Sequence, residues 1–272
     1  MPELPEVETI KNDLKKAILG KSIKAVSVHD PRVIRQPSPE AFKKGLRGAT
    51  IKDVLRRGKL LVLELSGEKF LTIHLRMTGQ LVYPGTDKAS RVFFSLSGGK
   101  GLDFNDQRLF GELRLVKDWQ SLPFVKNLGP EPFDLTLAGF KDMLSGCKSQ
   151  IKPLLMDQGF ICGIGNLYAA EILFRARINP EKRAQSLTVQ EKKSLFMAMN
   201  KILRMAIKYG GSSIDDYLRL SGKPGGYVAY HRVYGRAGKP CFVCKTLIKR
   251  VAQAGRGTYF CPKCQETHEK TS

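Results

Sequence analysis

The sequence contains no long hydrophobic run and few acidic residues for its length. None of its 272 residues falls in an apolar stretch of about 18, so we expect no membrane-spanning helix. The N-terminus lacks the basic and then apolar order of a secretory signal, which favours a cytoplasmic protein. Only 25 Asp and Glu residues oppose 46 Lys and Arg residues, a formal net charge of +21. This excess recurs along the chain and favours a polyanionic partner, nucleic acid before a membrane surface.

Hydrophobic and turn residues divide the chain into a β-rich part and a helical part. Short apolar runs separated by turn residues predict strands over residues 22–117, in a sandwich or barrel with a first helix packed against it. Prolines and glycines over residues 119–135 indicate a linker. Apolar residues over 195–206 have helical spacing, and Gly210 can end that helix. We therefore predict an α+β fold with a helix and β-sandwich domain at 1–118, a linker at 119–135, a helical domain at 136–234 and a small C-terminal domain at 235–272.

The six cysteines fall into two groups. Two are isolated and predicted to be ordinary thiols, Cys147 and Cys162. The other four form two C-x-x-C pairs that are separated by sixteen residues, namely Cys241, Cys244, Cys261 and Cys264. In a cytoplasmic protein this spacing predicts a closed, structural zinc site, with a β-hairpin between the pairs. Such a zinc finger can bind DNA, RNA or protein, so it does not by itself define the function.

The first residues can supply an amine nucleophile. The initiator methionine is normally removed before a small residue such as proline, and the chain would then begin with the secondary amine of Pro2. An α-amino group has a pKa of roughly 7.7–8.0, so part of it is neutral at cellular pH. The carboxyl groups of Glu3 and Glu6 follow closely and can move protons. The plainer alternative is that these residues only begin a helix, with Pro5 in its first turn and Gly20 at its end.

Two glycine-containing segments in the C-terminal half can approach phosphate. Arg256 lies between two glycines in the predicted hairpin, where its guanidinium can reach a phosphate or simply extend into solvent. Residues 161–168 place glycines before a helix, where exposed amide groups can bind an anion. This second segment is not a dinucleotide-binding fingerprint, because the third glycine and the βαβ context are absent.

The opening MPELPEVETI, residues 1–10, closely resembles the start of the formamidopyrimidine-DNA glycosylases, bacterial enzymes that excise oxidised purines. The resemblance runs through several motifs from Pro2 to Cys264 and implies a helix–two-turn–helix domain followed by a zinc-finger β-hairpin. It also implies that Pro2 is the nucleophile, that Glu3 transfers protons and that Glu6 supports their geometry. In the family, a lysine at the position of Lys59 contacts the phosphate beside the lesion and assists catalysis, and an arginine at the position of Arg256 contacts the DNA backbone there.

Further expected roles rest on the same resemblance. Lys152 and Asn166 would hold phosphates. Residues 74–79 and 106–111 match the loops that fill the space left by the flipped nucleotide. There Met77 and Phe110 would be the apolar wedge, and Arg108 would face the orphaned cytosine. From spacing alone, the apolar pair would belong to the core. A glycine-rich loop would cover the flipped 8-oxoguanine through Ser213, Lys223, Gly225 and Tyr227.

The sequence also departs from the family pattern. Many relatives have Lys-His-Asp-His where residues 88–91 read Lys-Ala-Ser-Arg, and Leu109 replaces a common basic residue. These changes affect backbone contacts and lesion preference but not the catalytic end. We expect a monomeric enzyme that acts on damaged duplex DNA, needs one structural zinc ion and uses no redox or nucleotide cofactor. The alternatives are an endonuclease VIII-type enzyme for oxidised pyrimidines, a non-catalytic zinc-ribbon protein that binds DNA or RNA, and an inactive paralogue that binds abasic sites.

Overall fold

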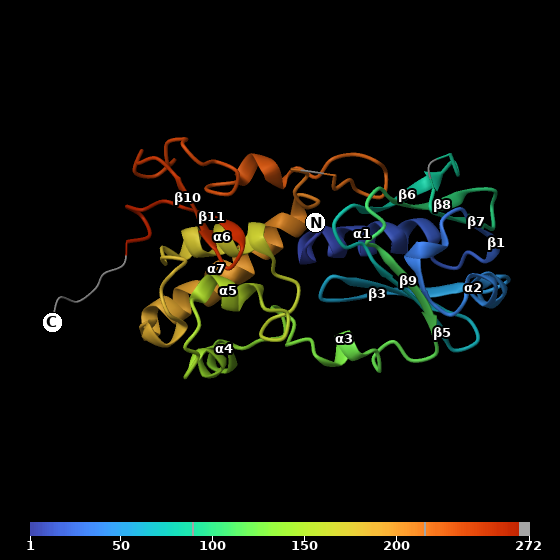
Figure 1. Ribbon diagram of the computed structural model, residues 1–272, viewed down its shortest axis with the longest axis horizontal. Coiled ribbons are helices and arrows are strands. Elements are labelled where there is room, and N and C mark those ends of the chain that lie inside the picture. The colour runs from blue at the N-terminus through green and yellow to red at the C-terminus, as the bar shows by residue number, and fades with distance from the viewer. Residues whose placement is uncertain (89, 215, 267–272) are drawn as a thin grey trace. The chain divides into compact units, whose positions relative to one another are not determined.

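The computed structural model describes residues 1–88, 90–214 and 216–266 (Figure 1). The chain forms two compact units that do not simply follow each other in sequence. The first contains Met1–Lys126 and Ala206–Val228, and the second contains Asn127–Met205 and the described residues from Ala229 onward. The first division falls inside the stretch predicted as a linker. The described residues of 206–228 belong to the N-terminal unit, although the sequence pattern predicts most of them as part of the helical domain.

The first unit begins with helix α1, Leu4–Ile18. Pro5 occupies its first turn, where the missing amide hydrogen has no intrahelical partner to lose. One face of α1 is almost completely buried, with Leu4, Val7, Ile10, Leu14 and Ile18 at most 1% exposed. The helix ends before Gly20, whose φ of 76° lies in the left-handed region. The predicted N-terminal helix and its end are confirmed.

Two sheets enclose the core of the first unit. One has four antiparallel strands in the order β1 (Ile23–Val28), β7 (Val92–Leu96), β8 (Gly101–Asp106) and β6 (Gly79–Gly85). The other has five strands in the order β2 (Ile34–Gln36), β9 (Glu112–Val116), β5 (Lys69–His74), β4 (Leu60–Leu65) and β3 (Ile51–Arg57), with only β2 and β9 parallel. Side chains of both sheets and of α1 form one buried cluster, so the predicted sandwich is confirmed.

Several elements of this unit were not predicted. Helix α2, Pro39–Leu46, lies in a lysine-rich stretch and buries only Phe42 and Leu46, so its apolar signal is weak. Its start is fixed locally, because the Ser38 side chain accepts the amide hydrogen of Ala41. Strand β8 has too few aliphatic residues to stand out, and β2 is only three residues long. The short elements η1 (Pro31–Val33) and α3 (Pro123–Lys126) were not predicted either.

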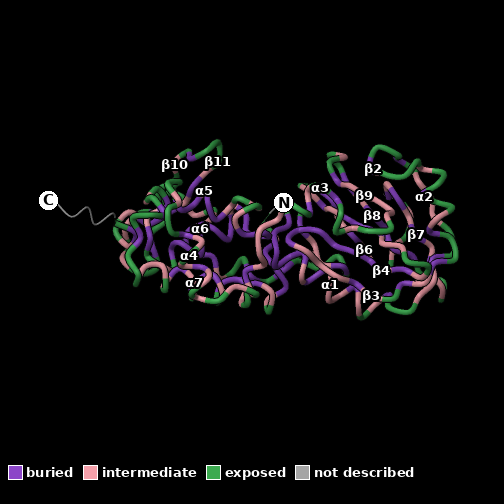
Figure 2. Tube along the Cα trace, turned by 90° about the horizontal axis from the view of Figure 1, so that it is seen from below, coloured by how far each residue is buried: buried purple, intermediate pink, exposed green. Residues whose placement is uncertain are grey.

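The second unit is mainly helical, as expected. It contains α4 (Leu137–Leu144), α5 (Ile151–Met156), α6 (Asn166–Ala176), η2 (Ala184–Ser186) and most of α7 (Val189–Lys208). The predicted stripe on α7 is buried at Leu195, Met199, Leu203 and Ala206. The chain then passes through η3 (Tyr227–Tyr230) to a hairpin of β10 (Lys249–Gln253) and β11 (Arg256–Phe260), which confirms the hairpin between the cysteine pairs. Figure 2 shows the buried segments of both units.

A buried carboxylate connects α6 to the segment that leads into the zinc-finger hairpin. Glu171 is 1% exposed, and its oxygens accept the backbone amide hydrogens of Arg232, Val233 and Tyr234 at 2.9–3.0 Å. Burial raises the pKa of Glu171 despite these hydrogen bonds. Across the described ranges, no helix combines the length and hydrophobicity needed to cross a membrane.

Candidate active site and zinc centre

Glu6 fixes the position of the first residues of the chain. Its Oε2 accepts the amide hydrogen of Glu3 at 2.8 Å, and its Oε1 accepts that of Ser212 at 2.9 Å. Glu3 and Glu6 are only 5% and 3% exposed, and Pro2 is also buried. Because one carboxylate holds both the N-terminal turn and the segment after α7, the backbone that carries Pro2 and Glu3 has a defined place in the first unit.

The glycine-rich segment, residues 210–214 and 216–227, is folded around its own polar groups. The Ser213 hydroxyl donates to the Tyr217 carbonyl oxygen at 2.6 Å and accepts the Gly225 amide hydrogen at 2.8 Å. The Tyr217 hydroxyl donates to the carbonyl oxygen of Gly210 at 3.0 Å. A Cβ atom at Gly225 would lie 2.4 Å from that same oxygen, so only glycine fits.

Two more candidates for base recognition lie in the same segment. Lys223 is exposed, and its carbonyl oxygen accepts the amide hydrogen of Arg219 at 2.9 Å. Tyr227 is fully buried, and its amide donates to the Gly211 carbonyl oxygen at 2.9 Å. Ser213 and Gly225 are therefore in direct contact, and Tyr227 is anchored to the turn that opens the segment, whereas Lys223 lies in an exposed turn closed by Arg219.

Lys59 lies at the turn between β3 and β4 and is 9% exposed. The turn contains Gly58, whose φ is 55°. It is braced by Arg56, whose guanidinium donates to the carbonyl oxygen of Gly58 and to Oε2 of Glu8 in α1, both at 2.8 Å. The position of Lys59 thus depends on a helix residue that is far away in sequence.

His74 pairs with the first residue of β4, and both cationic side chains and the carboxylate of Glu112 act on it. Burial, followed by the charges of Arg76 and other neighbours, lowers the pKa of His74 to about 3. Its Nδ1 accepts the amide hydrogen of Arg76 at 3.1 Å. A neutral imidazole is therefore part of the turn that precedes Met77.

The two apolar residues expected to fill the space left by the flipped nucleotide lie outside the core. Met77 and Phe110 are 42% and 47% exposed, which rules out the core role that spacing alone had favoured. Arg108 is also exposed, and its guanidinium carbon lies 4.8 Å from the centre of the Phe110 ring. An exposed arginine stacked on an exposed aromatic ring can contact bases.

Three residues of the second unit that are expected to bind phosphate lie in contact with one another or next to a contact residue. Lys152 in α5 donates from Nζ to Oδ1 of Asn166, the first residue of α6, at 2.6 Å. The Asn166 amide donates to the carbonyl oxygen of Gly257 at 3.1 Å, next to the exposed Arg256. Lys152 is 1% exposed. This arrangement places a lysine, an asparagine and an arginine around a helix N-terminus, a suitable setting for phosphate.

The four C-terminal cysteines meet at one point. All four sulfur atoms lie within 4.8 Å of one another. The Cys241–Cys264 and Cys244–Cys261 sulfur distances are 3.9 and 3.4 Å, close to the roughly 3.8 Å that a tetrahedron with 2.3 Å zinc–sulfur bonds requires. Backbone amides of Val243 and Cys264 point to two of the sulfurs at 3.4 Å. These residues fit one zinc ion, and four sulfur ligands leave no open position on it.

Family models match most of the chain. They are the formamidopyrimidine-DNA glycosylase N-terminal domain at residues 1–113, the formamidopyrimidine-DNA glycosylase H2TH domain at 128–217 and the zinc finger found in FPG and IleRS at 238–267. A formamidopyrimidine-DNA glycosylase of Pelotomaculum thermopropionicum is 43% identical, with 98% of this chain and 99% of the relative aligned. One from Desulforamulus reducens is 41% identical, with 98% of this chain and 99% of the relative aligned. The chain belongs to the formamidopyrimidine-DNA glycosylase family.

Solved structures of family members agree with this assignment. The MutM (Fpg) protein of Thermus thermophilus has a TM-score of 0.88 and 40% identity, covering 97% of this chain and 98% of its own. A mutant Fpg of Lactococcus lactis in complex with Fapy-dG-containing DNA has a TM-score of 0.90 and 36% identity, covering 97% and 100%. Another structure from that organism holds DNA with an abasic site, at a TM-score of 0.89 and 36% identity over 97% and 99%. The predicted family, fold class and zinc finger are confirmed.

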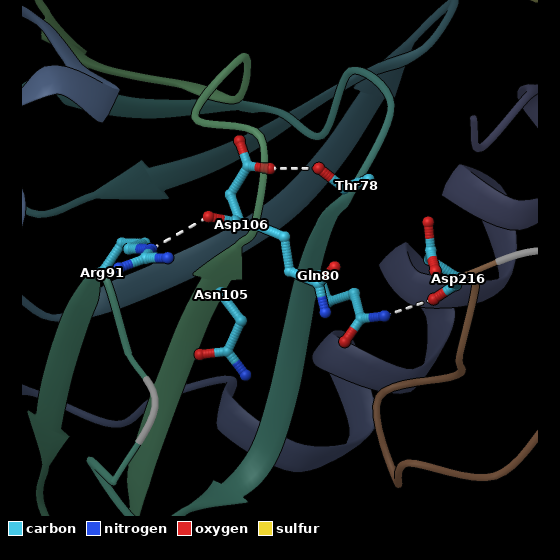
Figure 3. Close-up of a pocket in the computed structure, with 7 residues that line it drawn as sticks. Thr78, Gln80, Arg91, Asn105, Asp106 and Asp216 are labelled. Carbon is cyan, nitrogen blue, oxygen red and sulfur yellow. Dashed lines mark hydrogen bonds between the residues drawn. The ribbon is translucent and has the colours of Figure 1, made fainter.

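Family motifs did not reveal the residues whose hydrogen bonds hold the loops of the candidate site in place. A cavity of about 220 Å³ opens beside the loops that carry Met77 and Arg108 (Figure 3). Its lining includes Thr78 and Asp106, whose side chains are hydrogen-bonded to each other, and Arg91, which bonds to the Asp106 carbonyl oxygen. A short run of polar residues gives no sequence signal for such contacts.

Proposed function

We propose that this chain removes oxidised purines, such as 8-oxoguanine and formamidopyrimidines, from duplex DNA and then cuts the strand at the abasic site. The observation that carries the proposal is the buried Glu6 carboxylate, which holds both the N-terminal turn and Ser212. Pro2, the proposed nucleophile, and Glu3, the proposed proton-transfer group, belong to the same unit as the segment proposed to cover the flipped base, which supports the proposal.

The proposed chemistry begins after Met1 is removed. The neutral Pro2 nitrogen attacks C1′ of the flipped nucleotide, and the damaged base leaves with the electrons of its glycosidic bond and takes up a proton. Glu3 protonates the ring oxygen as the sugar opens to an iminium ion. The iminium acidifies C2′, so loss of a C2′ proton expels the 3′ phosphate, and a second elimination expels the 5′ phosphate. Water then hydrolyses the iminium ion and frees the amine.

DNA binding is proposed to use groups from both units. Lys59, Lys152, Asn166 and Arg256 would contact phosphates near the lesion. Met77 and Phe110 would fill the space left by the flipped nucleotide, with Arg108 facing the orphaned cytosine. Ser213, Lys223, Gly225 and Tyr227 would surround the flipped base. The zinc ion would hold the hairpin that carries Arg256 and would take no part in bond breaking.

We further propose that one copy of the chain suffices, because every proposed group comes from a single polypeptide. A cytoplasmic location follows from the substrate, since bacterial DNA lies there. The endonuclease VIII alternative uses the same chemistry on oxidised pyrimidines. Resemblance of the N-terminal stretch and of the loop with Arg108 and Phe110 to the purine-specific branch supports the purine assignment.

Borohydride trapping tests this proposal. The enzyme with its native terminus would be incubated with duplex DNA containing one 8-oxoguanine opposite cytosine, beside Pro2→Gly and a form with extra residues before Pro2. We expect a covalent protein–DNA adduct with the native terminus and none with the extended form, because its Pro2 nitrogen is an amide. Pro2→Gly keeps only a primary amine and should form much less adduct.

The same experiment separates the alternatives. An adduct with an oxidised pyrimidine but not with 8-oxoguanine would assign the chain to the endonuclease VIII type. Binding to an abasic site without any adduct would identify an inactive paralogue. A native protein that neither binds lesions selectively nor forms an adduct with any of these substrates would leave a zinc-containing nucleic-acid binder and overturn the enzyme assignment.

A further inference from the structure

Two loops of the first unit carry the groups proposed to enter DNA, and one threonine connects them. We define the plug loops as residues 75–78, between β5 and β6, and residues 107–111, between β8 and β9. Met77 belongs to the first and Arg108 to the second. Thr78 is 8% exposed and is the last residue of its loop. Figure 3 shows its side chain pointing across to Asp106, which precedes the second loop.

Thr78 is bonded to the second loop twice. Its hydroxyl donates to Oδ1 of Asp106 at 2.5 Å and accepts the amide hydrogen of Arg108 at 3.1 Å. The same amide hydrogen lies 3.2 Å, nitrogen to oxygen, from Oδ1 of Asp106. The other oxygen of Asp106 accepts the amide hydrogen of Gly111 at 2.6 Å. Asp106 is 2% exposed, and its hydrogen bonds to the Thr78 hydroxyl and the Gly111 amide are buried and therefore costly to lose.

The rest of the second loop has little freedom to compensate. Leu109 has a φ of 58°, and its side chain packs against the core of the first unit. A Cβ atom at Gly111 would lie 2.6 Å from the Phe104 ring and 2.8 Å from Oδ2 of Asp106. Arg91, which stands in the segment that departs from the family pattern, donates from Nε to the Asp106 carbonyl oxygen at 2.9 Å. Arg108 therefore projects from a backbone that is fixed on both sides.

We propose that Thr78 is a positioning residue that couples the two plug loops and thereby sets the preference of Arg108 for the base opposite the lesion. The inference rests on the proposed function, in which Arg108 faces that base. An arginine favours one base over another only when its donors are held in a fixed place, because a mobile guanidinium can satisfy several acceptors. The Arg108 amide hydrogen is shared by the Thr78 hydroxyl and Asp106, so the backbone from which the guanidinium extends is held in place.

Two variants of one residue test the coupling. Thr78→Val keeps the shape of the side chain but loses the hydroxyl, whereas Thr78→Ser keeps the hydroxyl. We would measure single-turnover kcat/KM for 8-oxoguanine opposite cytosine and opposite adenine. Loss of the hydroxyl should reduce the cytosine-to-adenine ratio about tenfold, the equivalent of one buried hydrogen bond. The serine variant should stay within about twofold of the original protein.

A double-mutant cycle with Arg108→Ala distinguishes positioning from general stability. If Thr78 acts through Arg108, then Thr78→Val should change the ratio by less than about twofold once Arg108 is gone. A reduction of the same size with and without Arg108 would overturn the proposal, as would a valine variant that keeps the original ratio. Melting temperatures of all four proteins would exclude unfolding as the cause.

The affinity for a stable abasic-site analogue tests the same coupling without requiring base excision. The ratio of affinities for this analogue opposite cytosine and opposite adenine should fall in Thr78→Val and persist in Thr78→Ser. If the protein excises no 8-oxoguanine but shows this pattern, the proposed substrate is wrong and the coupling stands. Equal affinity ratios for the original protein and the valine variant would refute the coupling even in an active enzyme.

Discussion

At the scale of single residues, His74 illustrates how a neutral side chain is kept among cations. Its pKa is lowered to about 3 by burial and then by Arg76, with Lys59 and Arg114 acting in the same direction and Glu112 opposing them. The Nδ1 hydrogen bond to the Arg76 amide also requires an unprotonated nitrogen. Protonation would therefore break a bond at the entrance to the Met77 loop and add a charge beside Lys59.

This environment predicts an acid-sensitive contribution to stability. Because the folded pKa lies below the ordinary value of 6.5, the unfolded chain binds a proton that the folded chain excludes as pH falls from 6.5 towards 3. His74 should then lower the free energy of unfolding by at most about 1.4 kcal/mol per pH unit in that window. His74→Asn keeps an acceptor but cannot titrate. Urea unfolding should therefore show that the free energy of unfolding falls less between pH 7.5 and 5.5 in this variant than in the original protein.

Part of the acid sensitivity should remain in that variant. His231 is 6% exposed, and burial lowers its pKa to about 4, which adds a slope of the same sign. Equal losses for His74→Asn and the original protein between the two pH values would contradict the assignment of His74 as a neutral group.

At the scale of elements, an ion pair joins the glycine-rich segment to α1. The Arg219 guanidinium donates to both carboxylate oxygens of Asp13 at 3.0–3.3 Å. The Arg219 backbone closes a turn, donating to the Lys223 carbonyl oxygen and accepting the Gly222 amide hydrogen. Next to it, Leu220 is 3% exposed and belongs to the core. The turn proposed to contribute to the cover over the flipped base is thus anchored to the helix that follows the proposed catalytic residues.

Removing this anchor should affect base excision but not strand cleavage at a preformed abasic site. Arg219→Ala should slow 8-oxoguanine excision about threefold to fivefold, the range of a partly exposed ion pair, because the covering segment is less often in place. An abasic site has no base to cover, so its cleavage rate should stay unchanged. Single-turnover kinetics on both substrates measure this difference.

A charge exchange provides the matched control. Asp13→Arg alone should slow excision at least as much as Arg219→Ala, and combining Asp13→Arg with Arg219→Asp should recover most of the loss. Equal slowing on both substrates would show that the pair stabilises the fold in general and does not serve base recognition.

The sequence alone predicted elements wherever one physical signal dominated. The aliphatic run of β4 and the buried stripe of α7 were found because hydrophobic periodicity decides their structure. Helix α2 was missed, since capping by Ser38 and two buried side chains leave little periodicity to detect. Candidate site residues were found through local motifs. Contacts such as Thr78 with Asp106 were not, because they join residues separated by 28 positions and depend on strand pairing.

At the scale of the whole molecule, the net charge of +21 is the feature that sequence shows most directly. Such a charge attracts DNA of any sequence, so it explains affinity but not selection of a lesion. Selection of a lesion has to come from contacts with the bases, while a few cations that meet phosphates at defined places fix where the DNA lies. Lys59, Lys152 and Arg256 are the proposed ones, and two of these three are buried or nearly buried, which restricts where a phosphate can meet them.

Salt dependence of DNA binding separates these two contributions. If the three cations each neutralise one phosphate, the slope of log affinity against log salt should be about −2.7 or steeper for a duplex with an abasic-site analogue. Arg256→Ala should weaken binding and make the slope shallower by about 1. Arg175→Ala removes the same charge from an exposed position in the last turn of α6 and should leave the slope nearly unchanged. Equal slopes for the two variants would mean that Arg256 acts only through net charge, and the phosphate contact at the hairpin would have to be abandoned.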